Sequence, residues 1–260
     1  MMQTIYKLKV LCLFVLSLAL WGCASTPADL LTPQGALRMG LYKGTPTSVL
    51  DFDGPGQARG IGYELGKNLA TQLEVGYDPV VFEKNADVLA AIRSGSVDLV
   101  FTNASADRAK YIQFSKTVIK IEKGFLISPH SKIGSLSEIN RRNIKIGYSV
   151  GSNTQSELPS LIPNASLVPT QSTKHAIALL KSGELDGFST NKAILYEMAA
   201  SIPKSRVLST IIGYEYLALG TPQSRAIPDS LLNDFVDRME STGKLKEIIQ
   251  RSGIQGLAPN

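Results

Sequence analysis

Arg108 is the side chain in this sequence that is best suited to hold a small anion. A guanidinium is a planar fork that meets a carboxylate or a phosphonate with two parallel hydrogen bonds. Ser105 lies three residues earlier, at the position that caps a short helix carrying the arginine. The alternative is an exposed Arg108 that forms a salt bridge with Asp107 or Glu83.

Ser152 and Asn153 form a second candidate anion site, since they begin a predicted helix directly after a predicted strand and Gly151. The first backbone N–H groups of a helix have no partner within it, and the helix dipole is positive at that end. The turn would therefore hold, from a second part of the chain, the same acidic group that Arg108 holds. The alternative is that Ser152 only caps its own helix.

Other reactive groups are few, which limits the chemistry that the chain can perform. The histidines, His130 and His175, are 45 positions apart, and neither has an acidic or histidine neighbour at the spacing of a metal site. The sequence contains no Gly-x-Ser-x-Gly motif, and neither histidine lies in a recognisable catalytic context. We therefore expect no metal, no cofactor and no catalytic residue.

The first 22 residues have the pattern of an export signal. Lys7 and Lys9 precede the apolar stretch Val10–Trp21, which is much shorter than the ~20 residues that cross a bilayer as a helix. The sequence Leu-Trp-Gly-Cys that ends at Cys23 resembles a bacterial lipobox, in which the cysteine receives a lipid. Cleavage before Cys23 would leave a lipid-anchored chain without a free thiol. The alternative is an ordinary signal peptide that happens to contain a cysteine.

Composition and charge limit the possible partners. The net charge is +5, but no run of five or more basic residues occurs, so the concentrated basic face that nucleic acid requires is absent. The 43% hydrophobic content and the length of 260 residues are sufficient for one large core or two small ones. We expect a monomer that binds no nucleic acid.

Short apolar runs alternate with helical patterns from Ala36 onward, which predicts an α/β fold. The predicted strands are residues 37–42, 79–82, 97–102, 144–148, 187–190 and 214–219. The predicted helices are residues 61–74, 86–93, 154–158, 173–181, 192–200, 229–240 and 244–251. Ser25–Gln34 contains two prolines and little periodicity, and it is predicted to be a tether.

An internal similarity indicates two lobes. Residues 88–102 read VLAAIRSGSVDLVFT and residues 176–190 read AIALLKSGELDGFST, so both run from a helix through Ser-Gly and Asp into a strand. Two copies of one unit predict two similar α/β lobes. Ligands bind outside the carboxyl ends of the strands in such sheets. Asn103 and Asn191 lie at those ends, and facing lobes would bring both to one cleft.

The turn of each copy contains a glycine and, three residues later, an aspartate. Gly95 and Gly183 lie where a helix ends with a left-handed residue. Asp98 and Asp186 follow them, and we expect both carboxylates to stabilise the start of the next strand rather than to act in catalysis.

Six short segments occur in an order that is typical of one protein family. They are Leu37-Arg38-Met39-Gly40, Asp53-Gly54, Gly60–Leu65, Ser105–Arg108 followed by Phe114-Ser115, Gly151–Thr154 and Thr242–Leu245. In this order they resemble the type II periplasmic solute-binding proteins, the bacterial extracellular solute-binding family 3. The closest resemblance is to its polar amino-acid receptor branch, which serves ABC importers. The resemblance covers about residues 36–252.

The resemblance implies a two-lobed periplasmic-binding-protein-like type II fold, with two α/β lobes joined by hinge strands near Lys120 and Tyr216. Such proteins close around a ligand by hinge bending. The implied organisation is a signal peptide (1–22), a lipid tether (23–35), lobe 1 (36–119 plus 217–260) and lobe 2 (120–216).

The resemblance also implies roles for site residues. Arg108 would clamp the carboxylate of the ligand, and Asn103 would add hydrogen bonds from the end of its strand. Tyr42 and Thr45 follow the first strand, where family members place stacking or hydroxyl groups, although Tyr42 is as readily interpreted as a buried core residue.

Asn191 departs from the family pattern, in which an Asp usually pairs with the α-ammonium of an amino acid. An amide brings no charge, and Lys192 adds a positive one beside it. We therefore expect an organic acid or another simple anion rather than a zwitterionic amino acid. Glu215 or Asp186 would have to replace the missing carboxylate for an amino acid to bind.

The implied function is the capture of a small anionic solute outside the cytoplasmic membrane and its delivery to an ABC permease, by a protein anchored through its N-terminal lipid. Two alternatives remain. One is a cyclohexadienyl-dehydratase-like enzyme, for which Glu215 is the candidate general acid. The other is a ligand-sensing lipoprotein that regulates a membrane partner.

Overall fold

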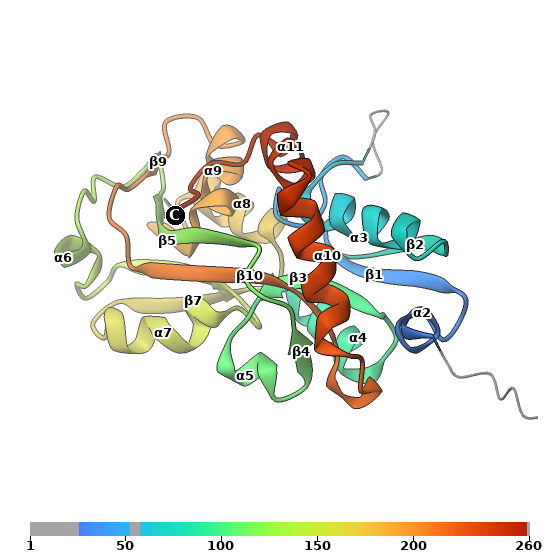
Figure 1. The fold of residues 1–260 in the computed structure, drawn as a ribbon. Coiled ribbons are helices and arrows are strands. Elements are labelled where there is room, and N and C mark those ends of the chain that lie inside the picture. Colours follow the sequence, from blue (N-terminus) through green and yellow to red (C-terminus); the bar gives the residue numbers. More distant parts are fainter. Residues whose placement is uncertain (1–25, 53–57, 259–260) are drawn as a thin grey trace, which may run out of the picture.

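The computed structural model describes residues 26–52 and 58–258. The expected signal peptide, the expected lipidation site Cys23 and the Asp53-Gly54 pair lie outside the described residues. The described part is a two-lobed α/β fold (Figure 1).

A continuous sheet of ten strands passes through both lobes in the described part of the chain. Its order is β2-β1-β3-β10-β5-β8-β6-β7, and β4 and β9 pair with β10 and β5. The strands are β1 (Ala36–Tyr42), β2 (Gly76–Phe82), β3 (Leu99–Asn103), β4 (Ile112–Phe114), β5 (Ile119–Ile127), β6 (Lys145–Ser149), β7 (Ser166–Thr170), β8 (Gly187–Asn191), β9 (Arg206–Val207) and β10 (Gly213–Pro222).

Helices connect the strands and cover the sheet (Figure 1). They are α2 (Pro27–Leu31), α3 (Ile61–Gln72), α4 (Asn85–Ser94), α5 (Ala106–Ala109), α6 (Leu136–Ile139), α7 (Asn153–Leu161), α8 (Thr173–Ser182), α9 (Lys192–Ala200), α10 (Asp229–Ser241) and α11 (Lys244–Ser252), with a 3₁₀ helix η1 at Gln223–Arg225. Within residues 26–52 and 58–258, no helix is sufficiently long and apolar to cross a membrane.

The strands β5 and β10 join the two lobes (Figure 1). β10 pairs antiparallel with β3 of lobe 1, and β5 pairs antiparallel with β8 of lobe 2. Between them, β5 and β10 pair with each other from Leu217 opposite Ile119 to Gly213 opposite Lys123. The expected two-lobed fold with two hinge strands is therefore confirmed.

The two halves of the sheet repeat one plan, as the internal similarity predicts. The order β2-β1-β3-β10 on one side corresponds to β7-β6-β8-β5 on the other. Gly95 and Gly183 end α4 and α8 with left-handed φ angles of 74° and 78°, so the predicted left-handed glycines are confirmed. The helices α4 and α8 then lead into the equivalent strands β3 and β8.

Asp98 and Asp186 also take equivalent positions. The Asp98 carboxylate accepts a hydrogen bond from Arg38 N in β1, and the Asp186 carboxylate accepts one from Lys145 N in β6, both at 2.9 Å. Each carboxylate thus secures the start of the neighbouring parallel strand. The predicted structural role of both aspartates is confirmed.

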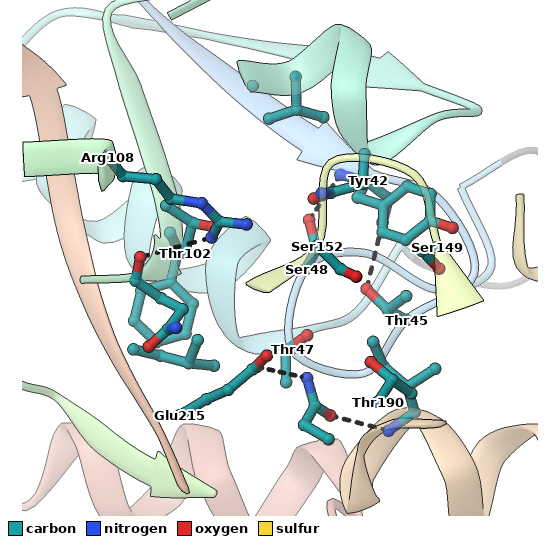
Figure 2. Close-up of a pocket in the computed structure, with 18 residues that line it drawn as sticks. Tyr42, Thr45, Thr47, Ser48, Thr102, Arg108, Ser149, Ser152, Thr190 and Glu215 are labelled. Carbon is teal, nitrogen blue, oxygen red and sulfur yellow. Dashed lines mark hydrogen bonds between the residues drawn. The ribbon is translucent and has the colours of Figure 1, made fainter. Parts of the chain in front are cut away.

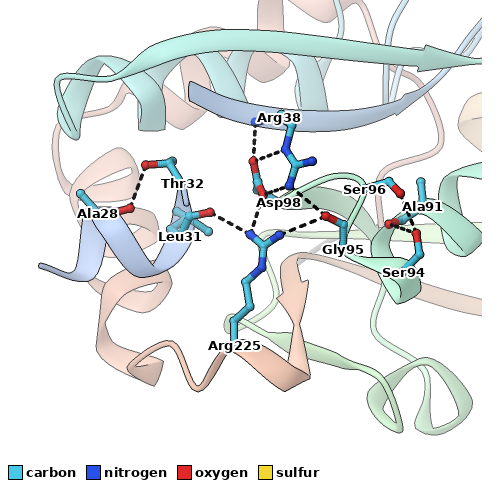
Figure 3. A network of polar contacts seen from close by, with 10 residues as sticks. All are labelled: Ala28, Leu31, Thr32, Arg38, Ala91, Ser94, Gly95, Ser96, Asp98 and Arg225. Atoms are coloured by element: carbon cyan, nitrogen blue, oxygen red, sulfur yellow. Dashed lines mark hydrogen bonds and ion pairs between the residues drawn. The ribbon is translucent and has the colours of Figure 1, made fainter. Parts of the chain in front are cut away.

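Asp98 is also the centre of a charged network that Asp186 lacks (Figure 3). It has no exposed surface, and its Oδ1 lies 2.6 Å from Arg38 Nη2 and 2.5 Å from Arg225 Nη1. Both arginines donate to Gly95 O as well. The network connects β1, the end of α4 and η1, so it joins the N-terminal and C-terminal chain segments of lobe 1.

The segment 25–34, which is predicted to be a tether, is partly folded. Residues Pro27–Leu31 form α2, which begins at Thr26 with a capping box. Leu31 has no exposed surface, and its carbonyl accepts a hydrogen bond of 3.0 Å from Arg225 Nη1. Part of the expected tether is therefore folded, because the cap and the buried leucine hold α2 on lobe 1.

Each lobe has a hydrophobic cluster on both faces of its part of the sheet. In β3, Leu99 and Phe101 belong to one cluster of lobe 1 and Val100 to the other. In β5, Phe125 and Leu126 divide between the two clusters of lobe 2 in the same way. Successive strand residues point to opposite faces. The sheet is therefore buried on both sides in each lobe.

Candidate functional site

A cavity of about 70 Å³ lies between the lobes (Figure 2). Its polar lining consists of Tyr42, Thr45, Thr47, Ser48, Asn85, Thr102, Asn103, Arg108, Ser149, Ser152, Thr190, Asn191 and Glu215. The lining comes from the carboxyl ends of β1, β3, β6 and β8, from the loops that follow them, and from the hinge strand β10. This is the place where open α/β sheets bind ligands.

Arg108 reaches the cavity from α5, and its guanidinium is held by both lobes. Nη1 donates to Thr102 Oγ1 at 2.6 Å and to Asn103 O at 3.4 Å, while Nη2 donates to Gly151 O across the cleft at 3.2 Å. Burial lowers the pKa of the guanidinium, and the carboxylate of Glu215 opposes that shift. An arginine remains protonated in proteins, so Arg108 places a fixed positive charge at the cavity.

Arg108 is not an exposed residue in a surface salt bridge, which was the alternative interpretation. Only 7% of Arg108 is exposed. Asp107 pairs with Lys110 and Glu83 pairs with Lys43, so both proposed partners are engaged elsewhere.

Ser105 and Asn153 lie outside the cavity. Ser105 Oγ accepts a hydrogen bond of 3.4 Å from Arg108 N, which is the predicted cap of α5. Both residues line an outer pocket of about 390 Å³ between α5 and α7, which shares Arg108 and Ser152 with the cavity. Ser105 thus supports the arginine through the cap of α5, and Asn153 lines the outer pocket only.

Ser152 lines the cavity, and its side chain makes no capping hydrogen bond to α7. Its Oγ is enclosed and has no hydrogen-bond partner among the described residues. A buried polar group left without a partner costs about 1–3 kcal/mol. The alternative in which Ser152 only caps its helix therefore does not hold, and the hydroxyl is available to a ligand beside Arg108.

Asn191 and Glu215 form the second polar pair of the cavity. Asn191 Oδ1 caps α9 by accepting from Ile194 N at 3.1 Å, and Asn191 Nδ2 donates to Glu215 Oε2 at 2.8 Å. Burial raises the pKa of the Glu215 carboxyl above its ordinary value, while the Asn191 hydrogen bond and the charges of Arg108 and Lys123 act against the rise.

Glu215 therefore supplies a carboxyl group beside the residue at which the family usually has an Asp. It extends from β10, whereas Asp186 lies at the opposite end of β8 and binds Lys145 N. The absence of a charge on Asn191 is thus no reason to exclude a ligand with an ammonium group. The lack of a carboxylate at position 191 therefore does not favour a simple anion over an amino acid.

Lys192 does not bring its charge to the cavity, contrary to expectation. Its Nζ pairs with Glu122 Oε2 at 2.9 Å and donates to Ser209 O at 3.0 Å. The other buried lysine of this region, Lys123, pairs with Glu157. Of the described residues, Arg108 and Glu215 are the charged side chains that line the cavity.

A model of the bacterial extracellular solute-binding proteins, family 3, matches residues 37–253. The chain belongs to this family. It is similar to the ABC transporter glutamine-binding protein GlnH of Bacillus subtilis (strain 168), with 21% identity over 213 residues that cover 80% of this chain and 78% of the relative. The family expected from the six sequence segments is confirmed.

Solved structures show the same fold. The solute receptor for L-cysteine of Neisseria gonorrhoeae matches with a TM-score of 0.79 and 19% identity, covering 89% of this chain and 99% of that chain. An ancestral amino acid-binding protein, a precursor of cyclohexadienyl dehydratase, matches with a TM-score of 0.76 and 20% identity, covering 87% and 99%.

Two further predicted residues of this family-3 protein, Tyr42 and Asn103, line the cavity, and each also makes a side-chain hydrogen bond to the protein. Tyr42 OH lies 2.9 Å from Thr173 Oγ1 and accepts a hydrogen bond of 3.1 Å from Thr173 N, at the start of α8 in lobe 2. Asn103 Oδ1 accepts from Tyr216 N at 2.8 Å. Tyr42 is thus buried, as one interpretation of the sequence has it, and it ties the lobes together. Thr45 Oγ1 donates to Tyr42 O at 3.3 Å.

Sequence reasoning missed several hydroxyl and amide groups of the family-3 cavity, namely Thr47, Ser48, Asn85, Thr102, Ser149 and Thr190. The internal similarity contains a signal for two of them, because Thr102 and Thr190 are the last residues of the two copies. Thr47 and Ser48 lie in a loop, Ser149 ends β6 and Asn85 begins α4, and none of them belongs to a local pattern. Asn85 Nδ2 donates across the cleft to Gly151 O at 3.1 Å.

Proposed function

We propose that this family-3 protein captures an α-amino acid in the cavity between its lobes and delivers it to an ABC permease. The observation that carries the proposal is the pairing of one buried guanidinium and one buried carboxyl group on the same cavity. These are the two charges that complement a zwitterion. The name of the Bacillus subtilis relative, a glutamine-binding protein, agrees with this ligand class.

The α-carboxylate of the ligand binds between Arg108 and Ser152. A guanidinium offers two parallel donors to a carboxylate, and Ser152 Oγ has no other partner in the described residues. The N-terminus of α7 adds its positive dipole end to the same group. The bond from Arg108 to Gly151 O is exchanged for the stronger, charge-assisted bond to the ligand.

The α-ammonium of the ligand binds Glu215. Asn191 Nδ2 already orients the carboxylate through Oε2. Glu215 lines the cavity, so its second oxygen is left for the ammonium. An organic acid without an ammonium would leave a negative or protonated Glu215 beside an anion. A zwitterion therefore fits the charges of the cavity better than a simple anion does.

Titration calorimetry with α-amino acids and with their deaminated 2-hydroxy acids tests this assignment. Tight binding of an amino acid and none of its hydroxy acid is the expected result. Arg108→Ala should weaken binding by about 2–5 kcal/mol, which is roughly 30- to 4,000-fold. Arg141→Ala is the control, because Arg141 is exposed and does not line the cavity. Unchanged affinity in Arg108→Ala would show that the site is wrongly placed.

The proposal includes binding without chemical turnover. Glu215 is the one acid that lines the cavity among the described residues, so a dehydratase would have to use it as the general acid. Incubation of the pure protein with prephenate or arogenate distinguishes the two functions, and consumption of either compound would favour the enzyme. A sensing role is distinguished by whether the loaded protein stimulates transport by a reconstituted permease.

We further propose how the chain is organised and where it acts. A signal peptide (1–22) is removed, Cys23 receives the lipid, and the protein acts as a monomer held at the surface of a membrane in the cell envelope. Lobe 1 comprises residues 36–119 and 217–260, and lobe 2 comprises residues 120–216. Mass spectrometry of the mature N-terminus tests the lipid at Cys23.

A further inference from the structure

We infer that the ligand of this cavity is an amino acid whose side chain is short and uncharged, such as serine, threonine, cysteine or alanine. The inference rests on the proposed function, because it takes Arg108 and Glu215 as the partners of the α-carboxylate and the α-ammonium. It adds what the rest of the cavity can accept.

The first argument is charge. Once Arg108 and Glu215 hold the two backbone charges of the ligand, the described lining contains no further charged side chain. The neighbouring lysines are committed outside the cavity, Lys123 to Glu157 and Lys192 to Glu122. A buried charge without a partner is strongly disfavoured. Basic and acidic side chains are therefore rejected.

The second argument is the hydroxyl groups that remain free. The side chains of Thr47, Ser149 and Thr190 line the cavity and make no hydrogen bond to another described residue. They come from both lobes, and Ser149 and Thr190 lie across the cavity from Arg108 (Figure 2). A hydroxyl both donates and accepts, so this wall suits a small polar group of either kind without demanding a charge.

The third argument is size. The cavity of about 70 Å³ has room for roughly five to seven water molecules, at about 10–15 Å³ for each. The carboxylate, the Cα atom and the ammonium of an amino acid already make up a similar number of heavy atoms. Only a few further atoms fit while the lobes remain in contact.

A longer side chain would have to separate the lobes. The contacts that hold them together include the buried contact of Tyr42 with Thr173 and the partly buried hydrogen bond from Asn85 to Gly151 O. A ligand that breaks these hydrogen bonds loses what closure contributes to its affinity. The cavity therefore discriminates against glutamine-sized side chains by preventing complete closure.

Calorimetry of the mature protein, after unfolding and refolding to remove any co-purified ligand, tests the inference with a panel of L-serine, L-threonine, L-cysteine, L-alanine, L-glutamine, L-glutamate and L-arginine. We expect the first four to include the tightest ligand and the last three to bind at least about tenfold more weakly. Tightest binding of glutamine, glutamate or arginine overturns this inference while the proposed function stands. Binding of none of the seven overturns this inference, and the proposed function falls as well if the remaining common α-amino acids also fail to bind.

A Thr190→Ser variant tests the role of the wall itself. It keeps the hydroxyl and removes a methyl group from the cavity side of β8, where Thr190 is 4% exposed. We expect the ratio of glutamine to serine affinity to rise by about tenfold, the effect of one methyl group in a closed pocket. Thr170→Ser is the matched control, because Thr170 is a fully buried strand threonine outside the cavity. An equal ratio in both variants would contradict the inference.

Discussion

Glu215 extends from the hinge strand β10, and its carboxyl group meets lobe 2 at Asn191. The carboxyl group thus lies at the cavity wall, beside the start of α9. Its burial is unusual in the local sequence, because Tyr214 and Tyr216 on either side are exposed to 37% and 46%. The strand thus turns a carboxyl group inward and two aromatic rings outward, and such an inversion of the usual pattern is typical of a functional position.

Glu215→Gln should stabilise the ligand-free protein while it weakens ligand binding. Burial raises the pKa of Glu215, so the protonated acid contributes folding stability that is complete below the unfolded pKa and is lost as pH rises through the folded pKa. The glutamine side chain does not ionise, so the variant does not lose this folding stability at high pH. We expect a higher melting temperature for the variant at pH 8, and a smaller difference near pH 4, in thermal scans with Glu247→Gln as the exposed control.

Ligand binding should require the ionised form of Glu215, whereas folding stability is favoured by the protonated form. Only the ionised form attracts an ammonium, so the affinity of the wild type for its amino acid should fall as pH falls through the raised pKa of Glu215. The variant should bind about 2–5 kcal/mol more weakly at neutral pH and lack this pH dependence. A variant that retains the affinity and the pH profile of the wild type would show that Glu215 does not touch the ligand.

At the scale of elements, the repeated unit of helix, turn and strand provides a matched comparison. Asp98 and Asp186 accept the same backbone hydrogen bond at 2.9 Å in the two lobes, but only Asp98 also binds Arg38 and Arg225. Asp98→Asn leaves two largely buried arginines without their counter-charge, which typically costs about 3–5 kcal/mol. Asp186→Asn alters a single hydrogen bond, worth about 0.5–1.5 kcal/mol.

Urea denaturation measures this difference directly, since the midpoint falls in proportion to the free energy of unfolding. Asp98→Asn should lower the midpoint several times more than Asp186→Asn does. Ligand affinity should be preserved in both variants that remain folded, because neither residue lines the cavity. Equal losses would indicate that the arginine network contributes nothing beyond the shared backbone bond.

The elements that sequence predicted best are those whose signals are local. Gly95 and Gly183 end their helices as predicted, and the bounds of α9 are the predicted ones. Four strands escaped the hydrophobic pattern, namely β4, β5, β7 and β9. β7 contains Pro169, which an edge strand tolerates because no neighbour needs its N–H. β5 obtains its partners β10 and β8 from distant parts of the chain, and no local pattern contains that information.

The same limit applies to the site. Arg108 and Asn191 could be predicted because each belongs to a segment with a recognisable pattern, and both line the cavity. The proximity of Glu215 to Asn191 depends on the pairing of β10 with β5 and of β5 with β8, so it is a property of the folded sheet. The proposed ligand class rests on that one contact, because Glu215 is the reason that an amino acid is proposed in place of the expected simple anion.

At the scale of the whole molecule, the lobes have a third connection besides the two hinge strands. The C-terminal segment that follows α11 pairs with β5, since Glu122 N donates to Gly256 O at 3.0 Å and Ala258 N donates to Lys120 O at 2.9 Å. Gly256 also packs against the start of α9 in lobe 2, where an added Cβ would lie 2.5 Å from Lys192 Cβ. The segment thus extends from lobe 1 over the hinge to lobe 2 (Figure 1).

Gly256→Ala should loosen this connection and open the cleft. The side chain would meet Lys192 at a φ of +80°, which is itself unfavourable for alanine, so the segment must leave α9. Fewer molecules would then be in the closed form, and the apparent dissociation constant rises in inverse proportion to that fraction. We expect ligand affinity to fall by about tenfold and the radius of gyration of the ligand-free protein, measured by small-angle X-ray scattering, to increase.

Gly253→Ala is the matched control for this effect, because Gly253 has a similar φ of +63° but no atom within 4 Å of the added Cβ. It carries the backbone strain of a left-handed alanine without the contact to α9. If the control changes affinity and radius of gyration as much as Gly256→Ala does, strain in the C-terminal segment is responsible and the hinge is governed by β5 and β10 alone. If only Gly256→Ala does so, the packing of the C-terminal segment on lobe 2 helps to set the closed state in which Arg108 and Glu215 face one ligand.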